Sequence, residues 1–151
     1  MTEASPALPA GFYERLVQGC PDAVVYADAG GVIRLWNEGA ARIFGFAAAE
    51  ALGQSLDLMI PERLRARHWQ GYDEVMGGRP SRYAAGALLA VPALHKDGRQ
   101  ISIEFTILPF QDGAGKLVGI AAILRDVTAR FEEVRGLRRE LAALRAQARG
   151  T

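Results

Sequence analysis

The pattern of apolar and polar positions divides this chain into short strands and helices. Residues 23–27 and 32–36 are two short apolar runs, and residues 28–31 between them read Asp-Ala-Gly-Gly. Turn-forming residues between two apolar runs predict a β-hairpin. Before the hairpin, residues 11–19 place apolar side chains on one side of a helix and end in glycine, so we expect a short helix there.

Helical patterns follow the hairpin. Asn37 is a typical N-cap residue, and we expect the helix that it begins to end near Gly45. Residues 47–53 predict one or two further helical turns, and residues 55–60 predict a short turn of helix. The longest helix is predicted over residues 61–76, where proline occupies the first position and its missing N–H costs nothing.

One face of this long helix is apolar apart from a single histidine. Successive positions on it are four, four and three residues apart, as in an amphipathic helix, and they are Leu64, His68, Tyr72 and Val75. His68 is therefore expected to point inward. Two interpretations stay open: the imidazole binds a ligand, or it fills the edge of the core and donates a hydrogen bond to a backbone carbonyl.

Three long strands are predicted to complete the domain. The first, over residues 82–94, contains Pro92, which indicates an edge position or a bulge. The second, over residues 100–110, alternates cleanly between apolar and polar side chains. The third, over residues 116–125, is apolar on both faces, so both faces should be covered.

Two segments could cover the outer face of the sheet, namely the N-terminal helix and the C-terminal residues 127–151. The C-terminal segment is strongly helical and repeats apolar residues at the heptad-like positions Val134, Leu137, Leu141 and Leu144. An isolated helix of this length is marginal. We expect a second copy to bury this seam, most simply as a parallel helix, although the sequence leaves the orientation open. The alternative is a helix folded back on its own sheet.

Composition restricts the function classes. The chain has 151 residues and a net charge of +1, so no bulk positive field favours nucleic acid or an anionic membrane. We expect no membrane span, because no apolar run reaches about 18 residues. Cys20 is the only cysteine, which excludes an internal disulfide. The first residues lack the blocks of a signal peptide, so we expect a cytoplasmic protein.

Sequence signatures of catalysis are weak. No nucleophile–histidine–acid order stands out. Residues 112–117 contain glycines and a lysine, but they lie in a predicted hairpin rather than a strand-to-helix turn, so they fail as a phosphate loop. His95 precedes a turn and is expected to be solvent-exposed, without a metal site shared with His68. We therefore do not expect an enzyme.

Several short motifs resemble those of the PAS (PAS/PAC sensory box) family. They are DAGGVI at 28–33, the Trp36-Asn37 pair, FGF at 44–46, ALG at 51–53, KDG at 96–98 and Arg125-Asp126-Val127-Thr128. The resemblance covers residues 11–130. It implies an α+β PAS fold, with a five-stranded antiparallel sheet, short helices on one face, a flanking N-terminal helix and a C-terminal coiled-coil helix.

The resemblance also implies a domain division and a function. Residues 1–10 would be a disordered leader, residues 11–126 a sensor domain with its flanking helix at 11–19, and residues 127–151 a signalling and dimerisation helix. Such a sensory module binds a small ligand or cofactor and relays occupancy through a homodimeric helix. Asp126 and Thr128 would anchor the start of that helix. Because the chain holds no kinase, cyclase or DNA-binding segment, output would pass through a partner protein or, in a longer protein, an output domain.

The ligand pocket is expected between the sheet and the helices. Its predicted lining consists of positions that point inward by strand alternation or by helical face: Leu64, His68, Tyr72, Leu89, Ile103, Phe105, Ile107, Ile120, Ala122 and Leu124. Small neighbouring residues leave room for a ligand. Apolar pockets with few polar groups suit planar or apolar ligands.

One branch of the PAS family binds b-type haem through a histidine on the long helix, and His68 resembles that axial ligand. In that branch a tyrosine usually follows three residues after the histidine, whereas Tyr72 follows after four. Oxygen-sensing members carry an arginine on the next strand, but residues 86–89 read Gly-Ala-Leu-Leu. Haem would then favour carbon monoxide, nitric oxide or redox sensing.

Two other interpretations stay open. The reactive cysteine of flavin photoreceptors is missing from the helix before the long one, and Cys20 lies far away, so a covalent flavin is not expected. A non-covalent redox flavin is less favoured than haem. The remaining alternative is a ligand-free PAS module for dimerisation or protein interaction.

Overall fold

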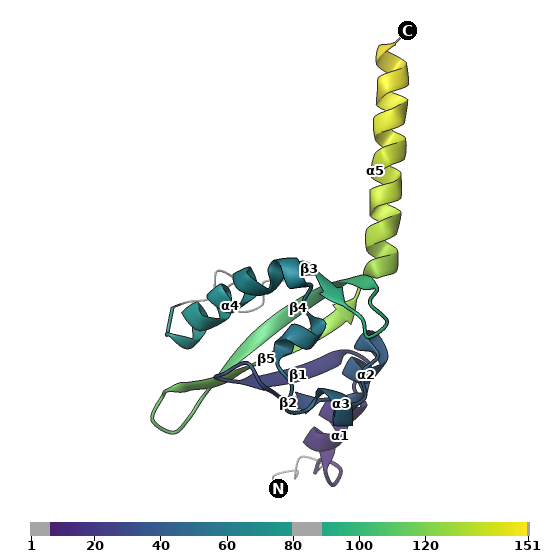
Figure 1. Cartoon of the computed structure of the whole chain (residues 1–151). Helices are drawn as coiled ribbons and strands as arrows, with labels where there is room; N and C mark the ends of the chain where they lie inside the picture. Colours follow the sequence, from purple (N-terminus) through teal and green to yellow (C-terminus); the bar gives the residue numbers. More distant parts are fainter. Residues whose placement is uncertain (1–6, 80–88, 151) are drawn as a thin grey trace, which may run out of the picture.

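The computed structural model describes residues 7–79 and 89–150 (Figure 1). This part of the chain contains one antiparallel sheet in the order β2-β1-β5-β4-β3. The strands are β1 (Ala23–Asp28), β2 (Ile33–Trp36), β3 (Leu89–Leu94), β4 (Gln100–Gln111) and β5 (Leu117–Asp126). The helices are α1 (Phe12–Gly19), α2 (Glu38–Phe44), α3 (Ala48–Ala51), the 3₁₀ turn η1 (Leu56–Met59), α4 (Glu62–Met76) and α5 (Thr128–Arg149). The predicted α+β class with a five-stranded sheet is confirmed.

Local sequence signals explain the ends of these elements. In the β1–β2 hairpin, the Asp28 carboxylate accepts hydrogen bonds from the backbone N–H groups of Gly30 and Val32. Asn37 caps α2, and Gly45 ends it with a φ of +83°, a value that favours glycine. Pro61 stands at the N-cap of α4, one residue before the position predicted for it.

The strand that contains Pro92 lies at one edge of the sheet. In β3, Pro92 is opposite Ser102 of β4, and no other strand of the described chain flanks β3. The predicted edge position is therefore confirmed. This strand was predicted from residue 82, and residues 82–88 lie outside the described residues.

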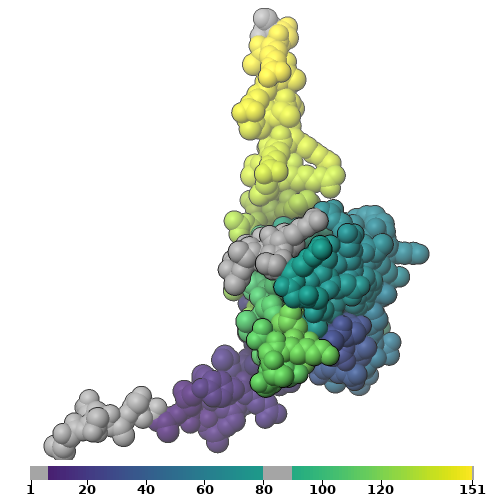
Figure 2. All heavy atoms as spheres, turned by 90° about the vertical axis from the view of Figure 1, so that its left-hand side faces the viewer, coloured from purple at the N-terminus to yellow at the C-terminus, as the bar shows by residue number. Residues whose placement is uncertain are grey.

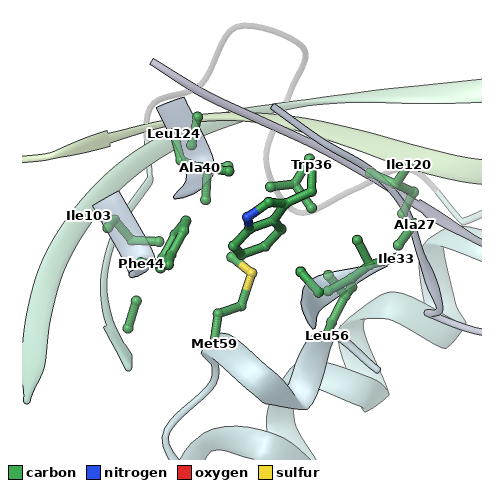
Figure 3. Packing of buried hydrophobic residues seen from close by; sticks show 14 of the residues in the cluster. Ala27, Ile33, Trp36, Ala40, Phe44, Leu56, Met59, Ile103, Ile120 and Leu124 are labelled. Atoms are coloured by element: carbon green, nitrogen blue, oxygen red, sulfur yellow. The ribbon is translucent and has the colours of Figure 1, made fainter. Parts of the chain in front are cut away.

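The hydrophobic core lies between one face of the sheet and the short helices. Figure 3 shows Trp36, Phe44 and Met59 pointing toward one another beneath the strands. The rings of Trp36 and Phe44 are 5.4 Å apart, and Trp36 Nε1 donates to the carbonyl of Phe46 at 2.9 Å. The inner face supplies Ala27, Ile103, Ile120 and Leu124. Burial at these alternate positions confirms the predicted inward face of the last two strands.

The outer face of the sheet is exposed in the single chain. Its large apolar side chains Leu108, Phe110 and Ile123 are all exposed. Both intramolecular covers considered from the sequence are wrong for the described residues. The helix α1 packs beside α2, and α5 leaves the domain at Thr128 and extends away from it (Figures 1 and 2). None of the described helices is both long and apolar enough to cross a membrane.

Candidate functional site

Three aromatic side chains of α4 form a contiguous group, which we call the α4 aromatic cluster: His68, Trp69 and Tyr72. The His68 ring centroid lies 4.9 Å from that of Trp69 and 5.9 Å from that of Tyr72. The Trp69 and Tyr72 rings are 5.4 Å apart. The three side chains therefore share one aromatic environment on the long helix.

Tyr72 fastens α4 to the sheet. Its side chain is buried, and its hydroxyl donates to the carbonyl of Asp28 and lies 3.2 Å from the carbonyl of Ala27. Burial raises the pKa of Tyr72, and the nearby Asp28 carboxylate adds to this effect. The phenol therefore stays protonated and acts as a hydrogen-bond donor across the neutral pH range.

Trp69 is a site residue that the helical face analysis from sequence did not place inward. Its Nε1 donates to Oδ1 of Asp57 at 2.7 Å. Its ring lies so close to Gly31 that a Cβ there would be 2.1 Å from Cη2 of the indole. Only glycine fits under this ring. The three-residue spacing from Trp69 to Tyr72 is the signal that could have indicated a shared face.

His68 holds a buried polar atom without a partner. The residue is half-buried, and its Nδ1 makes no hydrogen bond to any residue within 7–79 or 89–150. Burial lowers the pKa of His68, an effect that the Asp57 carboxylate partly opposes. The imidazole is therefore neutral at pH 7. Among the described residues, no carbonyl accepts from Nδ1; the core-edge interpretation does not specify which ring nitrogen donates, so it stays a prediction.

The other predicted lining residues fall into groups. Four are in the buried core: Tyr72, Ile103, Ile120 and Leu124. Three are partly buried and pack against it: Phe105, Ile107 and Ala122. Leu64 is half-buried on α4, and the side chain of Leu89 lies outside the described residues. The predicted lining residues on β4 and β5 therefore share the inner face of the sheet. The buried ones among them belong to the packed core, and the others pack against it.

Two surface grooves lie elsewhere. One is lined by Pro21, Asp22, Arg42, Ile43, Arg125 and Asp126, beside the end of β5. The other follows α1 and is lined by residues that include Phe12, Arg15 and Leu16. Both are polar-rimmed and open, and neither involves a residue of the predicted lining.

His95 is not solvent-exposed, so that expectation was wrong. Only 17% of its side chain is exposed, because the ring packs over the backbone of Gly45, where a Cβ would lie 2.6 Å from Cε1. Hydrogen bonds hold the turn after it against α2, including Lys96 N to the carbonyl of Phe44 at 2.9 Å. Within the described chain, no group of three or more His, Cys, Asp or Glu side chains could hold a metal ion.

His68 meets the donor requirement for haem. An axial imidazole must be unprotonated and must have a free nitrogen, and the neutral ring with its unpartnered Nδ1 has both properties. Phe105, Ile107 and Ala122 are partly buried apolar side chains on the inner face of the sheet, where they pack against the core. The imidazole of His68 therefore has the chemistry that an axial ligand needs.

Asp126 and Thr128 are brought together where β5 becomes α5. Oδ1 of Asp126 accepts from the backbone N–H of Thr128 at 3.0 Å and from its hydroxyl. The Thr128 hydroxyl in turn accepts from the N–H of Ser102 at 3.0 Å, and Val127 N donates to the carbonyl of Ser102. The first turn of α5 is thus tied to both β4 and β5.

Asn37 does more than cap a helix. Its Oδ1 accepts from the N–H groups of Ala40 and Val24, at 2.9 and 2.8 Å. Its Nδ2 donates to the carbonyls of Val17 and Asp22, at 2.8 and 3.0 Å. An aspartate could cap the helix but has no N–H to donate, and a serine has a single hydroxyl proton, whereas the amide of Asn37 accepts through its oxygen and donates through two N–H groups. One buried side chain therefore joins α1, β1 and α2.

Sequence and structure comparisons agree with this geometry. A family model described as PAS fold matches residues 17–132, which is most of the chain. The chain belongs to the PAS family. PAS domains are generally sensory rather than catalytic, and this domain is a sensory module of the kind that serves signal transduction.

The relatives of this PAS domain include a curated sensor. Sensor protein FixL of Bradyrhizobium diazoefficiens is 29% identical over 108 residues, which are 72% of this chain and 21% of FixL. The chain therefore spans about a fifth of the length of that relative.

Solved structures support the fold. The PAS domain of a protein from Colwellia psychrerythraea is 24% identical with a TM-score of 0.67, over 78% of this chain and 95% of that one. An RNA-binding light-oxygen-voltage receptor is 21% identical with a TM-score of 0.69, over 94% of this chain and 41% of the receptor.

Proposed function

We propose that this PAS domain is a cytoplasmic sensory module in which occupancy of a site beside His68 is relayed through β5 into a dimeric α5. The observation that carries the proposal is the buried, unpartnered Nδ1 of His68. The similarity to a protein named as a sensor, FixL, supports a sensory role.

A buried polar atom without a partner is a feature that a ligand can satisfy. Leaving such an atom unpaired costs about 1–3 kcal/mol. A ligand that hydrogen-bonds to the imidazole, or a ligand metal that the imidazole coordinates, recovers that cost. The recovered free energy then contributes to binding. The partly buried Phe105, Ile107 and Ala122 supply apolar surface for a planar ligand.

Haem b is the specific ligand that we favour. His68 would hold it as the axial ligand, and the apolar side chains of β4 and β5 would pack against it and limit access of water. When bound, haem supplies an iron centre that binds a diatomic gas or changes oxidation state. Residues 86–89 offer no side-chain donor to a bound gas, which favours carbon monoxide, nitric oxide or redox sensing over oxygen.

The relay uses the strand that joins the site to the helix. Ile120, Ala122 and Leu124 of β5 belong to or pack against the core, and the strand ends at Asp126. The bonds from Asp126 to Thr128 and from Thr128 to Ser102 connect that end to α5. A ligand that binds two arrangements of β5 with different affinity would therefore shift the orientation of α5. A partner protein or an adjoining output domain would detect this shift.

The test is a haemin titration of the purified protein followed by visible absorption. We expect wild type and the exposed neighbour variant Arg67→Ala to give the intense absorption band of bound haem. We expect His68→Ala to lose or displace that band, because its axial donor is gone. A band that is unchanged in His68→Ala, or absent from wild type, rejects the haem assignment.

A second function has its own support. The packing of Trp36, Phe44 and Met59 fills the interior, as expected of a ligand-free module for dimerisation. Such a module would form dimers while colourless, and its dimer mass and unfolding temperature would not respond to haemin. A shift in either quantity on adding haemin would favour the sensor.

A further inference from the structure

One face of α5 consists almost entirely of arginine. Each residue of a helix turns the chain by about 100°, so the spacing of residues assigns positions 135–149 to faces. Every one of these positions that falls within a single arc of about 120° is arginine or alanine. All of them are exposed, and Figure 2 shows α5 rising away from the rest of the molecule. We call this arc the arginine face, and its members are Arg135, Arg138, Arg139, Ala142, Arg145, Ala146 and Arg149.

The arginine face concentrates positive charge that the composition of the whole chain conceals. The net charge of the chain is +1, yet α5 contains six arginines, three glutamates and no lysine or aspartate. The helix therefore has a net charge of +3, and the remaining residues together have a net charge of −2. Its glutamates all lie outside the arc, at Glu132, Glu133 and Glu140. The small net charge of the chain thus gives no reason to exclude a polyanion from this one face.

The positive charges of the arginine face are not compensated by the residues that the structure describes. None of its arginines forms an ion pair with any of them. The pairs Arg135–Arg139 and Arg145–Arg149 place like charges four residues apart, which destabilises a helix. The helix dipole favours only Arg149, which lies in the last turn. An external anion would therefore relieve a repulsion that the isolated helix has to bear.

The length of the arginine face indicates a polyanion rather than a small ligand. At about 1.5 Å per residue, Arg135 and Arg149 lie about 21 Å apart along the helix axis. A guanidinium group binds the oxygens of one phosphate or carboxylate through two parallel hydrogen bonds. A small anion reaches one or two such groups, whereas a chain of anionic groups reaches all of them.

The side chains of the arginine face favour nucleic acid over a protein or a membrane. Protein interfaces have an apolar core, and no apolar side chain larger than alanine lies on this face between positions 135 and 149. An anionic membrane attracts cations on both sides of an apolar stripe, but Glu133 and Glu140 flank the seam of α5 on its other side. Interfaces with nucleic acid are polar and strongly positive, as this face is.

The shape of the arginine face favours a DNA duplex among the nucleic acids. Proteins that bind single strands stack bases on aromatic side chains, and positions 135–149 contain no aromatic residue. The major groove of B-form DNA is about 12 Å wide and admits an α-helix, whereas that of an RNA duplex is deep and narrow. The short side chains of Ala142 and Ala146 allow a phosphate backbone to approach the helix between the arginines.

We propose that the arginine face of α5 binds the phosphate backbone of double-stranded DNA. Because the contacts are electrostatic, we expect little preference for base sequence. The inference goes beyond the proposed function, since it gives α5 a partner of its own whether or not a ligand occupies the site beside His68. It also revises the expectation that the chain holds no DNA-binding segment.

Fluorescence anisotropy tests the proposal with the full chain and a labelled DNA duplex of about 20 base pairs, between about 50 and 200 mM salt. We expect wild type to bind and to lose affinity steeply as the salt concentration rises. Arg135→Gln with Arg139→Gln should bind at least about tenfold more weakly at the lowest salt. Its plot of log affinity against log salt should be shallower by about 1.8, because each lost phosphate contact removes about 0.9.

Two control variants separate charge on this face from other effects. Arg15→Gln with Arg67→Gln makes the same charge change at exposed positions of α1 and α4 and should bind as wild type does. Arg135→Lys with Arg139→Lys keeps both charges and should keep the wild-type salt dependence. Circular dichroism should give the same helix content for every variant. A lysine variant that behaves like the glutamine variant would show that something other than lost charge weakens binding, which contradicts the proposal.

The remaining outcomes decide between partners. A wild type that does not bind the duplex, or a glutamine variant that binds it as tightly as wild type, overturns the proposal. Polyglutamate, an RNA duplex and vesicles with anionic lipid are offered at the same salt concentration. If any of these binds more tightly than the DNA duplex, the assignment to DNA is wrong.

Discussion

At the scale of single residues, Asn37 shows how one buried amide can join three elements. Its exposed fraction is 1%, and its side chain serves two backbone N–H groups and the carbonyls of two residues that precede it by 15 and 20 positions. Removing it leaves those groups unpaired in a place that water reaches poorly. The cost therefore exceeds that of losing an ordinary helix cap.

We expect Asn37→Ala to lower the free energy of unfolding by about 2–4 kcal/mol, measured by urea denaturation. The control is Ser55→Ala, which removes an exposed cap with a single bond to Asp57 N. That variant should cost less than about 1 kcal/mol. Equal losses for the two variants would show that the long-range bonds of Asn37 contribute little.

His68 should make stability depend on pH. Because burial lowers its pKa in the folded state, the unfolded chain, with an imidazole pKa of about 6.5, binds the proton more tightly. The contribution of His68 is then fully present above pH of about 6.5 and is lost as the pH falls below it.

This dependence is measurable as a difference. For the haem-free protein, the free energy of unfolding of wild type minus that of His68→Gln should decrease as the pH is lowered from about 8 to about 5. The variant removes the titrating group and keeps a polar side chain of similar reach. A difference that stays flat or grows toward acid would contradict a lowered pKa.

The sequence predicted that Asn37 caps α2, but not that its amide nitrogen donates to a carbonyl of α1. Local patterns carry no information on chain segments that meet only in the fold. The same reason explains His95, whose burial depends on the bare backbone of Gly45. The inward position of Trp69 was missed for a different reason. A helix buries a stripe wider than one row of side chains, and the indole needed the absence of a side chain at Gly31 to fit.

At the scale of elements, the alternation of apolar and polar residues predicted which face of a strand is buried. It did not predict which segments of the chain cover the sheet. The apolar row of β4 that contains Ile101 and Ile103 is buried, as its period of two indicates. The doubly apolar β5 predicts cover on both faces, but its outward Ile123 is exposed in the single chain, so cover of the outer face stays a prediction. Which segment meets that need depends on tertiary geometry, and neither α1 nor α5 does so here.

At the scale of the whole molecule, the proposed dimer depends on α5, which extends away from the sheet (Figure 1). Leu141 lies at the middle of its seam, and 47% of the residue is exposed. An aspartate at this position would place a charge inside a helical interface, where burial without a partner is costly.

We expect Leu141→Asp to give monomers in sedimentation at concentrations where wild type is dimeric. Ala143→Asp, which adds the same charge on the outward side of the helix, should keep the wild-type mass. Both variants should unfold with the wild-type transition of the sheet, because α5 contributes no buried residue to the core. An unchanged dimer mass in Leu141→Asp would exclude the helical seam as the main contact.

The proline in β3 has a consequence for this chain at high concentration. Sheet edges invite strands from neighbouring molecules to add on, and natural proteins often blunt them with proline. One edge here carries Pro92, and the other is the four-residue β2. Within residues 7–79 and 89–150, neither edge offers a long unbroken template, so we expect crowded molecules to add strand to strand poorly even though Leu108, Phe110 and Ile123 leave the outer sheet face apolar and exposed.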